Sequence, residues 1–162
     1  RSVLDAKTAK WRESVSGDVP IFDGVENFVK KSSKELALGV VSMAKREEID
    51  HVLNLTGLRP YFSVILSAED IATHKPDPEC YREGFRQIDL HRIAQSHLPM
   101  VHADCLVIED SPQGVQAGKA ADLPVLGVTN TVSADVLRTA GADATAVRLD
   151  DWMPESLRRV FA

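Results

Sequence analysis

The chain has 162 residues, of which 44% are hydrophobic and 27% are charged, with a formal net charge of −5. This fits one globular domain with a substantial core. Asp and Glu (24) outnumber Lys and Arg (19), so we expect neither a nucleic-acid partner nor a membrane surface. The sequence has no apolar run of membrane-spanning length, and we expect no signal peptide. Cys80 and Cys105 lie far apart, which predicts free thiols in a cytoplasmic protein.

Short apolar segments alternate with amphipathic ones along the chain. In chain order they predict helices over residues 3–15 and 23–34, a strand over 36–41, a helix over 45–55, a strand over 62–66, a helix over 79–88, a strand over 105–108, a helix over 114–121, a strand over 125–128, a helix over 133–140, a strand over 144–149 and a helix over 154–160. Strands that alternate with helices predict right-handed βαβ units. The expected fold class is therefore α/β, with a parallel sheet between two layers of helices.

Polar side chains follow the first three predicted strands. Ser42 comes directly after the first strand, and Lys75 lies in the loop after the second. Glu109 and Asp110 follow the third strand. The carboxyl ends of parallel strands meet at one edge of the sheet, where such folds bind their ligands. Carboxylates suit a hard divalent cation, and Lys and Ser bind phosphate oxygens, so the sequence predicts a phosphate and magnesium site at this edge.

Three motifs occur around these residues. A strand ending in Ser spans residues 38–42 (LGVVS), a Lys-Pro-x-Pro loop spans 74–78 (HKPDP), and an apolar strand with an acidic pair spans 106–117 (LVIEDSPQGVQA). In this order they resemble the haloacid dehalogenase-like (HAD) superfamily of phosphatases and phosphotransferases. The resemblance covers about residues 20–130 and is strongest to the β-phosphoglucomutase and phosphoglycolate phosphatase-like branch. It implies a three-layer Rossmann-like core, Mg²⁺ as cofactor and a small phosphorylated metabolite, such as a sugar phosphate, as substrate.

The resemblance also implies a role for each matching residue. Ser42 would hydrogen-bond the transferring phosphoryl group. Lys75 would offset the charge between that group and a nucleophilic carboxylate. Glu109 and Asp110 would hold Mg²⁺, directly or through water. These roles agree with the chemistry, because phosphoryl transfer depends mainly on positioning and on neutralisation of charge.

The residues after Ser42 are further candidates. Met43, Lys45 and Arg46 lie where that branch often places phosphate or sugar contacts. The two basic residues are equally well explained as a solvated first helical turn.

Simpler structural roles are also available. Ser42 could cap the following helix, and Lys75 could be an ordinary exposed loop residue. Glu109 and Asp110 could cap the next helix, since acidic residues favour helix N-termini. Residues 114–120 (GVQAGKA) hint at a phosphate-binding P-loop, but their spacing does not match. Their small side chains instead predict close packing of a helix on the sheet.

The first motif of the family is missing. It is an apolar strand ending in Asp-x-Asp-Gly-Thr, which supplies the nucleophile and the general acid/base, and no Asp-x-Asp occurs in the 162 residues. Asp23 follows an apolar Ile-Phe pair but lacks a partner at this spacing, so we interpret it as the start of a helix. The chain also begins with Arg1 rather than Met, which suggests that it is processed or incomplete.

These observations predict an incomplete enzyme. Residues 1–20 would be the remnant of a helical cap domain and its linker, and residues 21–162 the α/β core. The core would lack its central first strand, which belongs between the Ser42 strand and the Glu109 strand. We expect the chain alone to be inactive, and expect a missing N-terminal segment or a second copy of the chain to cover the open strand edges. The alternative is a HAD-like binding or regulatory module without catalysis.

Overall fold

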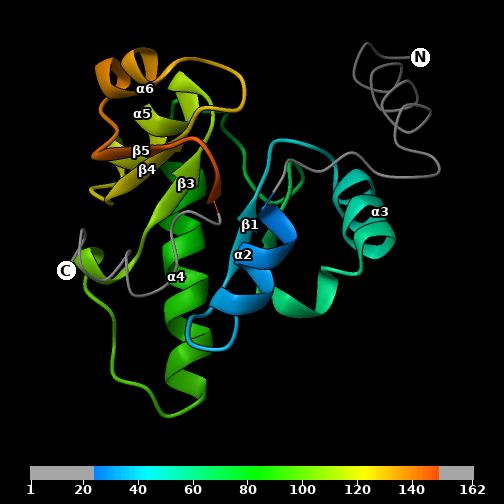
Figure 1. Ribbon diagram of the computed structural model, residues 1–162. Helices are drawn as coiled ribbons and strands as arrows, with labels where there is room; N and C mark the ends of the chain where they lie inside the picture. Colours follow the sequence, from blue (N-terminus) through cyan, green and yellow to red (C-terminus); the bar gives the residue numbers. More distant parts are fainter. Residues whose placement is uncertain (1–23, 150–162) are drawn as a thin grey trace.

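The computed structural model describes residues 24–149 (Figure 1). The elements, in chain order, are α2 (Val25–Ser32), β1 (Gly39–Val41), α3 (Arg46–Thr56), η1 (Arg59–Tyr61), β2 (Val64–Leu66), α4 (Glu79–Ala94), η2 (His102–Asp104), β3 (Val107–Glu109), α5 (Pro112–Ala120), β4 (Val125–Val128), α6 (Ala134–Ala140) and β5 (Ala144–Ala146). Every helix and strand predicted between residues 24 and 149 is present. The predictions for residues 1–23 and 150–162, including the cap remnant, lie outside the described residues.

All five strands are parallel, and they form two sheets. β1 pairs with β2, with Val40 opposite Ile65, and a second sheet has the order β3-β4-β5. Among the described residues no ladder joins β1 to β3. This agrees with the expectation that the central strand is absent from the chain.

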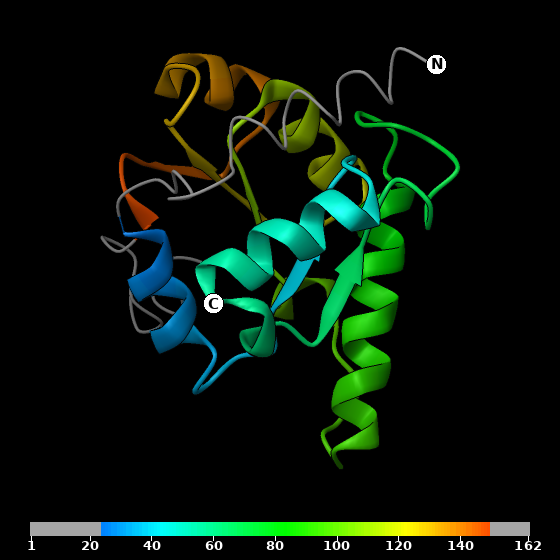
Figure 2. The ribbon, with the colours of Figure 1, turned by 90° about the vertical axis from the view of Figure 1, so that its right-hand side faces the viewer.

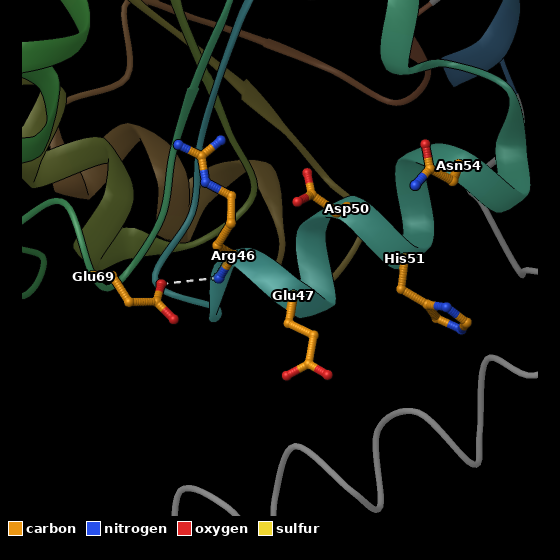
Figure 3. A pocket seen from close by; sticks show the side chains of 6 residues that line it. All are labelled: Arg46, Glu47, Asp50, His51, Asn54 and Glu69. Carbon is orange, nitrogen blue, oxygen red and sulfur yellow. Dashed lines mark hydrogen bonds between the residues drawn. The ribbon is translucent and has the colours of Figure 1, made fainter.

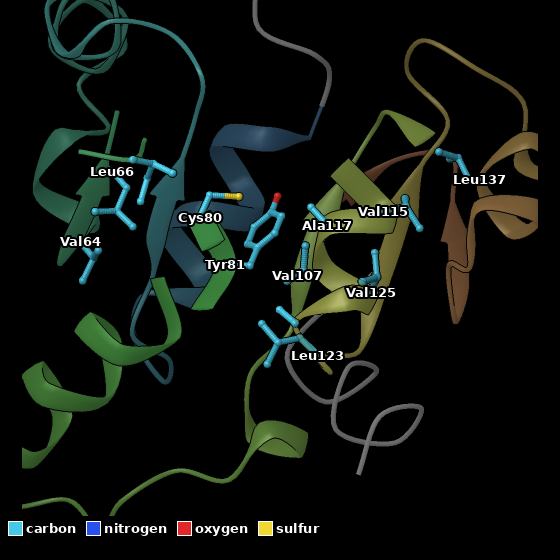
Figure 4. Close-up of a cluster of buried hydrophobic side chains, with 12 residues drawn as sticks. Val64, Leu66, Cys80, Tyr81, Val107, Val115, Ala117, Leu123, Val125 and Leu137 are labelled. Carbon is cyan, nitrogen blue, oxygen red and sulfur yellow. The ribbon is translucent and has the colours of Figure 1, made fainter. Parts of the chain in front are cut away.

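Side chains of each strand alternate between two helical layers, as the pleat requires. Val64 and Leu66 of β2 and Val125 of β4 belong to the cluster that α4, α5 and α6 cover (Figure 4). Ile65 faces the other way, toward α2 and α3, and so does Leu126, which packs against α2. Figure 2 shows β1 and β2 side by side, with α3 and α4 on opposite sides of them. The predicted three-layer α/β fold is confirmed.

Helices hold the two sheets together in place of a ladder. α4 contacts β1 and β2 and also packs against α5, which covers β3 and β4. On the opposite face, Phe28 of α2 packs with Leu126 of β4, while the adjacent Val29 packs with Ile65 of β2. The core is therefore continuous across both sheets.

Local sequence explains one of the helices that flank the candidate site, α5. Ser111 begins α5, because its Oγ accepts a hydrogen bond from the N–H of Gly114 at 3.1 Å and Pro112 follows it. A Cβ on Gly118 would lie 2.7 Å from Cγ2 of Val125. The small residue thus allows α5 to lie close on the sheet, which confirms the packing prediction for residues 114–120.

α4 continues to Ala94, whereas the pattern predicted an end near residue 88. Its last turns carry Leu90 and Ile93 on the surface rather than in the core. The hydrophobic periodicity therefore stops before the helix does.

No helix among residues 24–149 is long and apolar enough to cross a membrane.

Candidate functional site

Lys75 joins the carboxyl ends of β1 and β3. Its Nζ donates to the carbonyl oxygen of Val41 at 3.4 Å and to Oε1 of Glu109 at 2.5 Å. The side chains of Lys75 and Glu109 are only 15% and 8% exposed, so water screens this ion pair far less than a surface pair. Ser42 follows Val41 directly. The structure therefore brings these predicted residues to one edge of the two sheets.

A close-fitting set of groups surrounds the Glu109 carboxylate. The hydroxyl of Tyr81 donates to Oε1, the atom that Lys75 also contacts. Oε2 has a longer contact of 3.5 Å with Oγ of Ser111. A Cβ on Gly114 would lie 1.9 Å from Cδ of Glu109, so only glycine at position 114 leaves room for the carboxylate. The position of this carboxylate is thus defined on several sides.

Tyr81 contacts both members of the ion pair. Its hydroxyl bonds to Glu109, and Nζ of Lys75 lies 5.0 Å from the centroid of its ring, within the range of a cation–π contact. Burial raises the pKa of the Tyr81 hydroxyl, and the negative charge of Glu109 raises it further. The phenol therefore stays protonated and acts as a donor.

The sequence analysis did not identify Tyr81. A signal was nevertheless present, since Tyr81 lies in the first turn of the helix that follows the Lys75 loop. An aromatic residue on the inner face of that turn is positioned to meet the end of the next strand.

Asp110 lies beside Glu109 but has a different environment. It is half-buried, and its carbonyl oxygen accepts a hydrogen bond from Oγ1 of Thr131 at 2.8 Å. This bond ties the end of β3 to the loop after β4. The side chain that caps α5 is Ser111, so the capping role considered for the acidic pair belongs to the next residue.

Ser42 does not cap α3. Its Oγ accepts from the N–H of Ala44 at 3.1 Å, and the N-cap position of α3 is Lys45. The Lys45 N–H donates instead to Oε2 of Glu48 at 3.1 Å. Met43 is half-buried and packs against the cluster beneath α4 and α5. Ser42 is thus at the predicted edge, whereas the Met43 side chain contributes to the core.

Arg46 is engaged with two carboxylates at the start of α3. Its N–H donates to Oε2 of Glu69 at 2.9 Å, and its guanidinium lies 3.5 Å from Oδ2 of Asp70. Figure 3 shows the open pocket that Arg46 and Glu69 line together with residues of α3. Glu47 and Asp50 also line this pocket. Its lining has three carboxylates and one guanidinium, a balance that does not favour a phosphate group.

Glu109 and Asp110 have the chemistry of a magnesium site. Mg²⁺ is usually held by one or two carboxylates together with water and phosphate oxygens, and this pair fits that pattern. Among residues 24–149 no group of three or more His, Cys, Asp or Glu side chains could hold a metal ion. The remaining ligands would have to come from other segments, from water or from the substrate.

A sequence profile of the haloacid dehalogenase-like hydrolase family matches residues 2–128. The chain belongs to this family. Its sequence is 32% identical over 114 residues to validoxylamine A 7'-phosphate phosphatase from Streptomyces hygroscopicus subsp. limoneus, across 68% of this chain and 49% of that protein. This HAD-like chain spans about half the length of the curated relatives it matches.

Solved structures agree with this assignment. A haloacid dehalogenase-like protein of unknown function from Agrobacterium tumefaciens superposes with a TM-score of 0.72 at 28% identity, covering 100% of the HAD-like chain and 71% of its own. A β-phosphoglucomutase from Clostridium difficile also gives a TM-score of 0.72, at 22% identity and covering 97% and 62%. At that identity the likeness shows the fold alone. The family predicted from the three motifs is confirmed.

Proposed function

We propose that this chain carries most of the core of a Mg²⁺-dependent phosphatase or phosphotransferase. Its substrate would be a small phosphate ester such as a sugar phosphate. The observation that carries the proposal is Lys75, whose ammonium bridges the end of β1, next to Ser42, and the carboxylate of Glu109. Membership of a hydrolase family and the similarity to a phosphate-ester phosphatase support the same chemistry.

Four residues at this edge of the sheets have a role in the proposed reaction: Ser42, Lys75, Glu109 and Asp110. The Ser42 hydroxyl donates to a phosphoryl oxygen, and the Lys75 ammonium neutralises charge between that group and the nucleophile. Glu109 and Asp110 hold the cation, which when bound offsets further negative charge on the phosphate. An aspartate from outside the 162 residues attacks phosphorus and the ester P–O bond breaks. The leaving oxygen takes a proton from a general acid, also outside the 162 residues, and the alcohol leaves. Water, or a hydroxyl of a second substrate, then gives its proton to that same group, now acting as a base, attacks phosphorus and releases the aspartate.

The nucleophile would reach the site on a strand between β1 and β3. The N–H of Ser42 donates to Leu66, so the backbone groups of Gly39 and Val41 point away from β2. By the same alternation the N–H of Val107 faces β4, and the backbone groups of Ile108 point away from β4. We call the interval between these edges of β1 and β3 the break.

Burial supports an additional strand in the break. All of β2 is buried, whereas Gly39 is exposed and Val40 and Val41 are only half-buried. An inner strand should be buried at least as well as its outer neighbour. The partner that fits is an apolar segment from the N-terminal side of the protein that ends in aspartate. Its carboxylate would then lie beside the Lys75 ammonium.

A peptide complementation assay tests the proposal. The 162-residue chain is mixed with a synthetic peptide of five apolar residues followed by Asp-Leu-Asp-Gly-Thr, and hydrolysis of p-nitrophenyl phosphate and of a sugar-phosphate panel is followed with Mg²⁺ or EDTA. We expect turnover only with peptide and Mg²⁺ together. The same peptide with its first Asp replaced by Asn is the matched control, and it should bind without turnover.

Three results would contradict the proposal. Turnover by the chain alone would show that the nucleophile lies within the 162 residues. Binding of the peptide without turnover on any ester would favour a non-catalytic module. Sedimentation that shows a stable dimer unaffected by the peptide would mean that a second copy of the chain covers the break.

A further inference from the structure

Tyr81 is placed to control the geometry of the Lys75–Glu109 pair. It is 8% exposed and rises from the first turn of α4 into the core cluster (Figure 4). The backbone of α4 is fixed there, because the N–H of Tyr81 donates to the carbonyl oxygen of Pro78 at 3.1 Å. A rigid helix therefore fixes the position of the hydroxyl.

The Tyr81 hydroxyl donates a hydrogen bond to one specific oxygen of Glu109, Oε1. Tyr81 and Lys75 both bond to Oε1, while the backbone of Gly114 lies so close that a Cβ there would overlap the carboxyl carbon and both oxygens. Two donors on one oxygen and a close backbone contact leave little freedom to rotate about the last side-chain bond. Neighbours of this kind orient metal ligands, and their loss typically lowers metal affinity or activity by about 10–100-fold.

We infer that Tyr81 is a positioning residue, whose hydroxyl orients the Glu109 carboxylate for cation binding while its ring supports the Lys75 ammonium. The inference rests on the proposed function for the role of Glu109 as a cation ligand. The contacts between Tyr81 and Glu109 stand independently of it. The two functions of Tyr81 can be separated, because Phe retains the ring and lacks the hydroxyl.

The first test measures cation binding by the 162-residue chain mixed with the complementing peptide. Free Mn²⁺ is followed by electron paramagnetic resonance for the wild type and the Tyr81→Phe variant. We expect the dissociation constant for Mn²⁺ to rise about tenfold or more in Tyr81→Phe. Tyr61→Phe is the matched control, since Tyr61 lies in η1 and packs against a different cluster. Equal Mn²⁺ affinities of Tyr81→Phe and the wild type would overturn the inference.

A second test does not depend on the metal. The ¹³Cδ resonance of Glu109 is assigned by comparison with Glu109→Gln in protein labelled at the glutamate carboxyl carbon. We expect Tyr81→Phe to shift this resonance and Tyr61→Phe to leave it unchanged. An unshifted resonance would overturn the inference even if the wild type bound no Mn²⁺. Absence of Mn²⁺ binding together with a shifted resonance would count against the proposed function and support the positioning of Glu109.

Discussion

Replacement of Gly114 by Ala tests the packing around Glu109 most directly. The added Cβ would lie 1.9 Å from Cδ and 2.0 Å from Oε2 of Glu109. Carbon atoms pack best about 3.5–4.0 Å apart, so either the carboxylate or α5 must move by roughly 1.5 Å. The carboxylate cannot turn away without losing a hydrogen bond to Lys75 or Tyr81.

The net cost follows from opposing contributions. A lost hydrogen bond to a charged group costs about 1.5–3 kcal/mol, and overpacking from a shift of α5 costs about 1–3 kcal/mol. Replacement of a helical Gly by Ala by itself stabilises the fold by about 0.5–1 kcal/mol. We expect Gly114→Ala to lower the free energy of unfolding by about 1–2 kcal/mol, which corresponds to a Tm lower by about 2–8 °C. Urea unfolding of the two proteins measures this difference.

A double-mutant cycle assigns the cost to Glu109. Where Glu109→Ala has already removed the carboxylate, Gly114→Ala should be neutral or stabilising by up to about 1 kcal/mol. Gln116→Ala, an exposed change in the same helix, controls for helix propensity. An equal loss from Gly114→Ala in both backgrounds would show that the clash lies elsewhere, and the account of Gly114 would be wrong.

Two further predictions concern titratable groups. The N–H and Oγ of Ser67 both donate to Asp70 and lower its pKa from 3.8. A lowered pKa adds stability only while the carboxylate is ionised. Asp70→Asn should therefore lower the free energy of unfolding by about 1 kcal/mol near neutral pH. In urea titrations this difference from the wild type should shrink as the pH falls below 3.8. Burial raises the pKa of Cys80 and raises that of Cys105 to about 11, so iodoacetamide at about pH 8 should alkylate both slowly until urea is added. Rapid alkylation of either thiol in the folded protein would contradict this.

The sequence was sufficient to predict the strands and the residues that follow their carboxyl ends. Apolar runs such as residues 125–128 can only be buried between two layers of helices, and the topology then fixes where each run ends. Ser42, Lys75 and Glu109 therefore reach the same edge without any knowledge of side-chain contacts. The absence of an Asp-x-Asp motif likewise predicted that β1 and β3 would not pair, because the strand between them was unaccounted for.

Contacts that depend on tertiary packing could not be predicted. Arg46 follows Ser42 closely in sequence, yet Glu69 and Asp70, more than twenty residues away, determine its partners. The place of Tyr81 in the first turn of its helix indicates only that it lies near the site. The approach of β3 to α4 is what shows that its hydroxyl meets Glu109. Such pairings join residues that no periodic pattern connects.

The absence of a ladder between β1 and β3 also affects how the amides exchange with solvent. In a continuous parallel sheet the middle strands are protected longest, and exchange begins at the outer strands. Here the N–H groups of Gly39, Val41 and Ile108 point into the break, in the middle of the fold. They have no partner strand among residues 24–149. Deuterium should therefore enter at these three amides as early as it enters at the outer strands. A strand bound in the break would slow exchange at these three amides, so each would report occupancy of the break directly.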